Sequence, residues 1–381
     1  MKIALVRRKY SPYGGAERYL EDLSIQLSRL GHEVHIFSNR WPSQNDIPSI
    51  IVHRVPMIRG QGLIELMTFN RNVNHVLQRE SFDIIQSLEK TITQDLYHGE
   101  EGCHRQWLLQ RRRYEPFMDR MGIRLNPFHW VSLALEKRLF EKSPTKYFIA
   151  ISKRGREEIM THYPQAKDRI RVIYNGLQLI SPAPMMERSE RRNKTEKTIL
   201  FVGSGFFRKG LFFLIRALPY LQKISPVRLI IVGGGNQKKV GILAEEEKVA
   251  DRITLTGPEK NVAPYYQAAD VLVLPSIYEP FGNVCLEAMA YGLPVVTTEA
   301  AGASEIIIPG KNGVVIKDPA DIKELTEAVA DALTLDRKQV RKTDEMILPS
   351  FTWDQHIKNL TGLYQEVLQE KKGGNSGLSS R

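Results

Sequence analysis

The sequence predicts an α/β protein with two open, doubly wound domains, each a parallel sheet covered by helices. Two observations lead to this fold class. Strand-like runs alternate with helical patterns in the first half of the chain, and the same alternation begins again in the second half. The length of 381 residues also suits two domains, since a domain usually has roughly 100–200 residues.

The first half opens with a short apolar run, KIALV, that predicts a buried strand. A helix is predicted over 16–30, because its leucines recur on one face and Gly31 follows where helices commonly end. Further strands are predicted at EVHIFS, SIIVHRV and FDIIQS. The opening apolar run is too short for a secretory signal, so we expect a cytoplasmic protein.

The second half has shorter apolar runs, which suit strands that are buried on both faces of a sheet. These runs are TILFVG, RLIIVGGG, RITLTG, DVLVLPS and LPVVTT, and a helix is predicted over 211–218 after the first of them.

The first domain is predicted to span 1–176, ending after VIYNG, and the second to span 177–351. The polar, proline-bearing segment 181–197 between their cores has the composition of a linker or mobile loop. A final helix is predicted over 352–370, followed by a disordered tail at 371–381.

Composition narrows the class of partner. The net charge of +11 favours an anionic partner, such as a nucleotide, an anionic lipid or a nucleic acid. The two cysteines form neither a metal-ligand spacing nor a disulfide framework.

The segment 103–146 interrupts the α/β pattern. It has ten Lys or Arg against four Asp or Glu, with four aromatic residues among them, Trp107, Phe117, Phe128 and Trp130. Such a segment can bind an anionic membrane surface, or it can be an ordinary helical insertion with a solvated face. We do not expect nucleic acid as partner, because no nucleic-acid-binding fold accompanies the charge.

Three groups of residues could carry chemistry. Gly14 and Gly15 lie between the first strand and its helix, where a helix N-terminus can meet a phosphate. An ordinary tight turn could have the same two glycines. The dinucleotide-binding motif G-x-G-x-x-G is absent at this turn. Arg208 and Lys209 follow a strand and a glycine turn, where they could bind a diphosphate leaving group or simply be solvated.

The third group is the segment YEPFGNVCLEAMAYG at 278–292. Glu279 lies on the loop after a predicted strand, and Asn283 is a suitable N-cap for a helix that carries Glu287 near its first turn. Both carboxylates then lie at the carboxyl end of a sheet, where such folds bind ligands. One could accept hydrogen bonds from a transferred sugar and the other from a ribose, while backbone N–H groups of Gly282, Asn283 and Val284 face phosphate.

Together these motifs resemble the retaining glycosyltransferases of family 4. The matching pieces are EPFGNVCLE, RKG, GG and VIYNG, and the resemblance covers nearly the whole chain. It implies the GT-B fold, in which two Rossmann-like domains face each other across a cleft, the first binding the acceptor and the second a nucleotide sugar.

The resemblance also implies roles for residues. Glu287 would bind the ribose and Glu279 the donor hexose; Arg208 and Lys209 would bind the diphosphate, which Gly15 approaches from the first domain. The donor site would include the matching stretch Phe281, Gly282, Asn283 and Val284, and Gly14 beside Gly15. No metal or other cofactor is expected, and no Asp-x-Asp motif is present.

Within the family, the segments KYSPYGGAER and VGSGFFRKG are most similar to the bacterial lipopolysaccharide core glucosyltransferases, which have a membrane-facing basic segment where 103–146 lies. The resemblance implies a UDP-sugar donor, a heptose-bearing glycolipid acceptor and a place on the inner face of the cytoplasmic membrane. The catalytic position of the first domain aligns with Glu101, with His98 and His104 nearby as alternatives.

Other activities remain open at this point. Nucleotide-sugar 2-epimerases share the two-domain architecture, and a pyridoxal-dependent phosphorylase and a catalytically silent membrane-binding protein are further alternatives. The acceptor could also be another lipid-linked glycan or a small molecule. Retention without a firm nucleophile favours front-face transfer, in which Arg208 and Lys209 stabilise the leaving phosphate.

Overall fold

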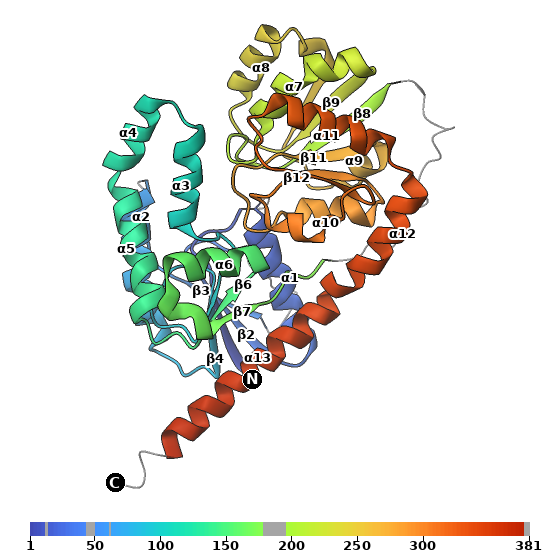
Figure 1. The fold of residues 1–381 in the computed structure, drawn as a ribbon. Coiled ribbons are helices and arrows are strands. Elements are labelled where there is room, and N and C mark those ends of the chain that lie inside the picture. The colour runs from blue at the N-terminus through green and yellow to red at the C-terminus, as the bar shows by residue number, and fades with distance from the viewer. Residues whose placement is uncertain (12–13, 43–49, 61, 178–195, 377–381) are drawn as a thin grey trace. The chain divides into compact units, whose positions relative to one another are not determined.

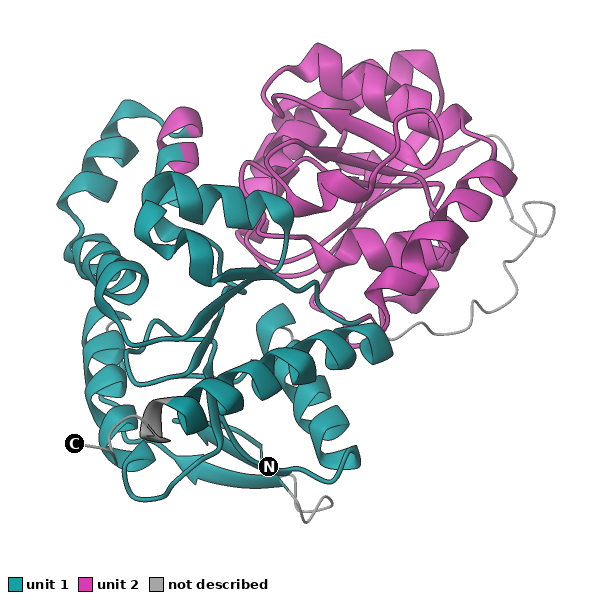
Figure 2. Cartoon of the chain, turned by 60° about the horizontal axis from the view of Figure 1, so that its bottom comes forward, with its two compact units in different colours: residues 1–109, 115–176, 353–381 teal, residues 110–114, 177–352 magenta. Residues whose placement is uncertain are grey.

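The computed structural model describes residues 1–11, 14–42, 50–60, 62–177 and 196–376. The chain divides into two compact units (Figures 1 and 2). The first unit comprises residues 1–109, 115–176 and 353–381, and the second comprises residues 110–114 and 177–352. Most of the predicted linker, residues 181–195, lies outside the described residues.

The first unit is built on a seven-stranded sheet in the order β3-β2-β1-β4-β5-β6-β7, and all its strand pairs are parallel. The strands are β1 (Lys2–Val6), β2 (Glu33–Ser38), β3 (Ile50–Arg54), β4 (Ile84–Ser87), β5 (Leu96–His98), β6 (Tyr147–Ala150) and β7 (Ile170–Val172). The helices are α1 (Gly15–Arg29), α2 (Gly62–Leu77), α3 (His104–Tyr114, of which residues 110–114 belong to the second unit), α4 (Phe117–Leu125), α5 (Pro127–Lys142), α6 (Lys153–His162), the short η1 (Pro164–Arg169) and α13 (Trp353–Ser376).

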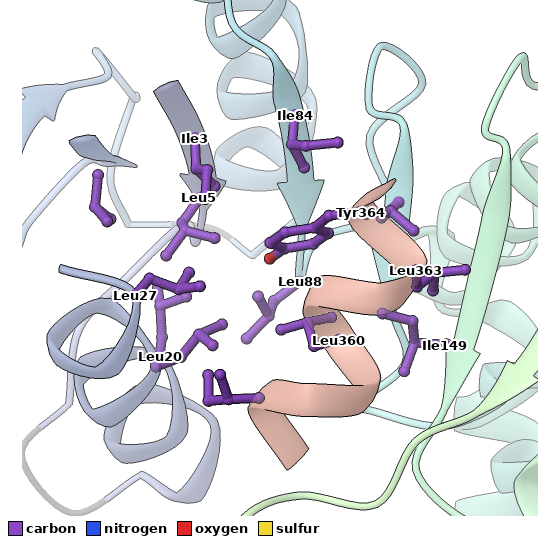
Figure 3. Packing of buried hydrophobic residues seen from close by; sticks show 14 of the residues in the cluster. Ile3, Leu5, Leu20, Leu27, Ile84, Leu88, Ile149, Leu360, Leu363 and Tyr364 are labelled. Carbon is purple, nitrogen blue, oxygen red and sulfur yellow. The ribbon is translucent and has the colours of Figure 1, made fainter. Parts of the chain in front are cut away.

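The central strand β1 explains why this sheet needs helices on both faces. Ile3 and Leu5 belong to a core cluster with leucines of α1 and α13 (Figure 3). Ala4 and Val6 point the other way, into a cluster with Phe69 of α2. Because successive side chains of a strand alternate between the faces, an unbroken apolar run is buried on both.

The last helix, α13, belongs to the first unit although the chain reaches it through the second. Its buried side chains join the β1 core, and the Tyr364 hydroxyl donates a hydrogen bond of 2.7 Å to Gln86. The predicted disordered tail from 371 is wrong for its first residues, since the helix continues to Ser376. Lys371 anchors this extension by donating bonds of 2.8 Å to Asp83 O and the Asp95 carboxylate, and extending a formed helix costs little.

The second unit is built on a six-stranded parallel sheet in the order β10-β9-β8-β11-β12-β13. The strands are β8 (Lys197–Val202), β9 (Val227–Val232), β10 (Ile253–Gly257), β11 (Val271–Leu274), β12 (Val295–Thr298) and β13 (Gly313–Ile316). The helices are α7 (Leu211–Ile224), α8 (Gln237–Glu246), α9 (Ala263–Ala268), α10 (Asn283–Ala290), α11 (Ile322–Thr334) and α12 (Arg337–Ile347), with short turns η3 (Ala250–Arg252), η4 (Gly302–Ile306) and η5 (Leu348–Phe351).

Both sheets confirm the predicted doubly wound α/β class, with all the strands that the sequence predicted. Helix α7 is longer than predicted because it continues past Pro219 to Ile224. Proline removes one intrahelical hydrogen bond, but Leu218 and Leu221 on either side of it are buried, and their burial holds the helix together.

Candidate functional site

The strongest polar cluster of the second unit lies at the carboxyl edge of its sheet. Arg208 and Lys209 follow β8, and Glu279 follows the neighbouring strand β11. The backbone joins these two loops, since Ile277 N donates to Arg208 O over 2.9 Å. The backbone of Glu279 is joined to the loop after β12. Glu279 N donates to Ala300 O, and Gly302 N donates to Glu279 O, each over 3.0 Å. Three adjacent strands therefore position one cluster.

Within this cluster, the Glu279 carboxylate pairs with both cations. Its Oε2 lies 3.0 Å from Arg208 Nη1 and 2.8 Å from Lys209 Nζ. Burial acts to raise the pKa of Glu279, but Arg208 and Lys209 outweigh it and lower the pKa to about 2. Glu279 is thus an ionised acceptor for hydroxyl groups, beside two cations that suit a diphosphate.

Glycines let the backbone crowd around Lys209. A Cβ on Gly203 would come within 2.5 Å of Lys209 Cδ, so the lysine stem lies along the glycine. Gly210, at a φ of +75°, approaches Pro275 so closely that a Cβ would lie 1.7 Å from its carbonyl oxygen. The loops after β8 and β11 can meet only because Gly210 carries no side chain.

The start of α10 differs from the prediction. Gly282, not Asn283, is the N-cap, with a φ of +101° that favours glycine, and Asn283 is the first helical residue. Asn283 and Val284 are half-buried in the first turn, where N–H groups have no partner within the helix. The Phe281 side chain is buried and stacks on Phe351 with ring centroids 6.0 Å apart, and its carbonyl oxygen accepts a hydrogen bond of 2.8 Å from Ala303 N. Phe281 therefore supports the loop from the interior.

Glu287 lies in the second turn of α10 rather than the first. Its Oε2 accepts a hydrogen bond of 2.6 Å from the Tyr266 hydroxyl, and Tyr266 stacks on Tyr291. Glu287 is half-buried and therefore keeps access to solvent. The sequence did not single out Tyr266, because a tyrosine in a short helix has no distinguishing pattern.

In the first unit, Gly14 is the N-cap of α1 and Gly15 its first residue. A Cβ on Gly14 would lie 1.8 Å from Glu17 Oε2, whereas a Cβ on Gly15 would meet none of the described residues within 4 Å. Gly14 therefore makes room for Glu17, and open space adjoins the backbone at Gly15.

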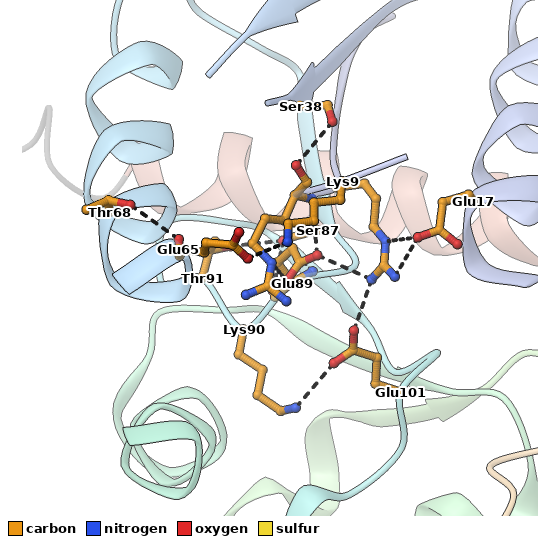
Figure 4. A network of polar contacts seen from close by, with 12 residues as sticks. Lys9, Glu17, Ser38, Glu65, Thr68, Ser87, Glu89, Lys90, Thr91 and Glu101 are labelled. Atoms are coloured by element: carbon orange, nitrogen blue, oxygen red, sulfur yellow. Dashed lines mark hydrogen bonds and ion pairs between the residues drawn. The ribbon is translucent and has the colours of Figure 1, made fainter. Parts of the chain in front are cut away.

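Glu101 follows β5 and belongs to a network of charged side chains (Figure 4). Arg7 lies at the centre, 3.1 Å from Glu101, 3.2 Å from Glu89 and 2.9 Å from Glu17. Lys90 Nζ lies 3.8 Å from Glu101. Desolvation acts to raise the pKa of Glu101, but Lys90, Arg7 and Arg8 outweigh it and lower the pKa to about 2. Its side chain is 44% exposed, so an ionised carboxylate is presented to solvent.

The two histidines near Glu101 lie in different surroundings. His98 is fully buried, within 3.2 Å of the Tyr19 hydroxyl and of Asn175 Oδ1, and burial, with His356 second, lowers its pKa to about 3. His104 begins α3 and lies 3.2 Å from His129, and burial lowers its pKa to about 4. Of the three candidates, Glu101 is the ionised and exposed one.

Sequence reasoning missed Arg7, Glu89 and Lys90. Arg7 directly follows β1, and Glu89 and Lys90 follow β4 closely, so all three lie at the carboxyl edge of the first sheet. The rule that selected Glu279 would have selected them too.

The basic segment 103–146 forms α3, α4 and α5. Glu136 of α5 holds it to the network around Glu101: its carboxylate accepts bonds of 2.7 and 3.0 Å from His104 N and Arg105 N and lies 3.6 Å from Lys90. Phe117 and Trp130 are exposed, whereas Trp107 and Phe128 are half-buried. Among the described residues, no helix has both the length and the apolarity to cross a membrane.

Comparisons with known proteins agree with this arrangement. Residues 13–179 match the model of the family Glycosyltransferase Family 4, and residues 184–346 match the model Glycosyl transferases group 1. The chain therefore belongs to the glycosyltransferases, with the two-domain GT-B fold.

Similar proteins span nearly the whole chain. An uncharacterized glycosyltransferase of Methanocaldococcus jannaschii is 27% identical, covering 97% of this chain and 99% of that protein. The lipopolysaccharide glucosyltransferase WaaG of Escherichia coli is 25% identical, covering 88% and 90%.

The solved structure of WaaG matches with a TM-score of 0.77 over 96% of this chain and 98% of that one, at 23% identity. The structure of HepE from Anabaena, in complex with UDP-glucose, matches with a TM-score of 0.70 over 98% and 100%, at 18% identity. These two solved structures therefore support the GT-B fold for both units of the chain.

Proposed function

We propose that the protein is a retaining hexosyltransferase that moves a hexose from a UDP-sugar, such as UDP-glucose, to a glycolipid acceptor bearing lipopolysaccharide core heptose. The cluster of Arg208, Lys209 and Glu279 carries the proposal, because it offers two cations and an ionised carboxylate at the sheet edge where such folds bind ligands. The likeness to WaaG supports the acceptor, and the UDP-glucose bound to HepE supports the donor.

The proposed transfer takes place on one face of the sugar. As the bond between the sugar and the diphosphate breaks, the leaving phosphate accepts the proton of the acceptor hydroxyl, and the new glycosidic bond forms on the same face. Arg208 and Lys209 stabilise the negative charge that grows on the phosphate, so no metal is needed in this step. Glu279 binds the hexose hydroxyls, Glu287 binds the ribose, and Glu101 positions the acceptor or stabilises the positive charge that develops on the sugar.

The decisive assay is UDP release from a panel of UDP-sugars, with and without truncated lipopolysaccharide that ends in heptose. Release that requires one donor and this acceptor supports the proposal and identifies both substrates. Release without acceptor would instead indicate hydrolysis or epimerisation. Transfer to a different lipid-linked glycan would retain the enzyme class and correct the acceptor. EDTA should leave the initial rate unchanged.

Lys209→Ala tests the leaving-group role. Removing one donor to developing charge costs about 10²–10³-fold in turnover, so we expect a loss of this size with little change in acceptor binding. Lys223→Ala is the matched control, because Lys223 is an exposed lysine near the end of α7. Turnover of Lys209→Ala equal to that of the control would contradict the role.

We also propose that α4 and the start of α5 bind the anionic inner face of the cytoplasmic membrane, which would place the enzyme beside a lipid-linked acceptor. Large apolar side chains are exposed there, namely Phe117 at 71%, Met118 at 77%, Leu125 at 64% and Trp130 at 57%. Arg120 and Arg124 are exposed on the same helix α4. Apolar side chains with neighbouring arginines suit the interface of an anionic bilayer.

Co-sedimentation with vesicles tests this surface. The protein should bind vesicles of phosphatidylcholine with phosphatidylglycerol, less so in high salt, and bind weakly to phosphatidylcholine alone. The double variant Phe117→Ser, Met118→Ser should lose at least tenfold in binding, because two large side chains no longer enter the bilayer. Tyr220→Ser, at an exposed aromatic residue of α7, is the control. Equal binding by the double variant and the control would refute the surface.

A further inference from the structure

A cluster of two histidines and a glutamate lies in the first unit, apart from the groups described above. His35 is in β2 and His53 in the adjacent edge strand β3, where Phe37 is the direct register partner of His53. Glu80 lies on the segment that leads from α2 to β4. In the sheet, β1 and β4 separate β2 from β5, after which Glu101 lies. The cluster is therefore not part of the candidate transfer site.

The ligand atoms of these three side chains converge. His35 Nδ1 lies 2.7 Å from His53 Nε2. A ring nitrogen of each histidine and a carboxylate oxygen of Glu80 all lie within 4.8 Å of one another. We propose that His35, His53 and Glu80 bind a zinc ion, with water in the fourth position.

Glu33 orients His35 for this role. The His35 Nε2 atom lies 2.6 Å from Glu33 Oε1. Because a carboxylate only accepts hydrogen bonds, Nε2 carries the proton, and the lone pair of a neutral His35 is on Nδ1, which faces His53. A histidine whose second nitrogen donates to a carboxylate is the usual arrangement around protein-bound zinc.

Aromatic neighbours hold both imidazole rings. Phe37 stacks on His53 with centroids 4.4 Å apart and an interplanar angle of 5°. Phe82 meets His35 edge-on, with centroids 5.1 Å apart. Tetrahedral zinc with bonds of about 2.0–2.1 Å would need the two nitrogens about 3.3 Å apart. A small side-chain rotation of the half-buried His53 supplies that separation, and its Nε2 proton moves to Nδ1.

Charge and ligand type favour zinc among the common ions. The carboxylates of Glu33 and Glu80 both pair with Lys2, whose Nζ lies 2.8 Å from Glu80 and 3.7 Å from Glu33. With neutral histidines the net charge is −1, which attracts a divalent cation. Two imidazoles and a carboxylate are ligands of zinc, whereas magnesium and calcium prefer oxygen ligands alone.

A zinc ion here would join β2, the edge strand β3 and the segment after α2. It would stabilise this side of the first unit and leave the transfer chemistry unchanged. The zinc site can therefore be tested independently of the proposed transferase activity.

Zinc binding to the full chain provides the test. After EDTA treatment and desalting, Zn²⁺ is titrated in competition with a chromophoric chelator. We expect the wild-type chain to bind one zinc ion more than His53→Gln does, and zinc to raise the melting temperature of the wild type but not of His53→Gln. Glu33→Gln should bind this zinc about 10–100-fold more weakly, the usual effect of losing such a partner.

Two further variants provide a second ligand substitution and a control. Glu80→Gln changes an exposed side chain, so it tests the site without disturbing the core, and it should also weaken zinc binding at least tenfold. His75→Gln removes an exposed histidine in the last turn of α2 and should bind zinc as the wild type does. Unchanged zinc affinity in both His53→Gln and Glu80→Gln, or no zinc binding by the wild type, would overturn the proposal.

Discussion

Asp344 should make the second unit less stable as the pH rises. It lies on α12 with its side chain fully buried, and Asn312 donates a hydrogen bond of 3.0 Å to its Oδ1. Its Oδ2 finds no hydrogen-bond partner in the part of the chain that the structure describes. Burial raises the pKa from 3.8 to about 8, against the opposing effects of Asn312 and Arg337.

The sign and size of the effect follow from proton linkage. Below pH 3.8 the carboxyl group is protonated in both the folded and the unfolded states. Between 3.8 and about 8 the unfolded chain loses this proton while the folded chain keeps it, so the free energy of unfolding falls by about 1.4 kcal/mol per pH unit. Above about pH 8 the contribution is constant. Asp344→Asn removes this dependence and keeps the shape of the side chain.

We therefore expect the free energy of unfolding of Asp344→Asn to exceed that of the wild type by an amount that grows with pH. Between pH 5 and pH 7 this difference should increase by about 2–3 kcal/mol. Hydrogen exchange of peptides from β13 and α12 at several pH values measures it within the second unit. Glu327→Gln is the control, because Glu327 is an exposed glutamate of α11 that does not contribute to the pKa shift of Asp344. A difference between Asp344→Asn and the wild type that does not vary with pH would refute the reasoning.

Three further predictions concern the supports of the two sites. Glu136→Ala removes the carboxylate that binds two helix N–H groups and lies near Lys90, and it should lower the free energy of unfolding by about 3–5 kcal/mol. Chemical denaturation followed by tryptophan fluorescence measures this change. The control Glu141→Ala should change the free energy of unfolding by about 0.5 kcal/mol or less. Gly210→Ala places a Cβ against Pro275 O and should destabilise the second unit by more than about 2 kcal/mol. The control Gly241→Ala, in open space on α8, should stabilise the unit by about 0.5–1 kcal/mol. A melting temperature of Gly210→Ala at or above that of the wild type would contradict this prediction. Tyr364→Phe removes the hydrogen bond to the buried Gln86 and should cost about 1–3 kcal/mol, and no loss in urea denaturation would show that the bond is not needed.

Local patterns were enough to predict which side chains lie at the carboxyl edge of the second sheet. Arg208, Lys209 and Glu279 each follow a recognisable apolar strand, and parallel strands bring their carboxyl ends to one edge of a sheet. The short strands β5, β6, β7 and β13 escaped prediction, because three or four residues carry too little periodic signal to separate a strand from a loop.

The amino-acid sequence by itself determined the α/β class, the two-domain organisation of the family and the residues of the second charge cluster, because apolar periodicity and strand-end motifs are local properties. Only the tertiary structure decided which charges meet around Glu101, that His98 is buried and that ligand atoms of His35, His53 and Glu80 converge. These contacts join residues far apart in the chain, and their distances depend on strand order and register, which a single sequence does not specify.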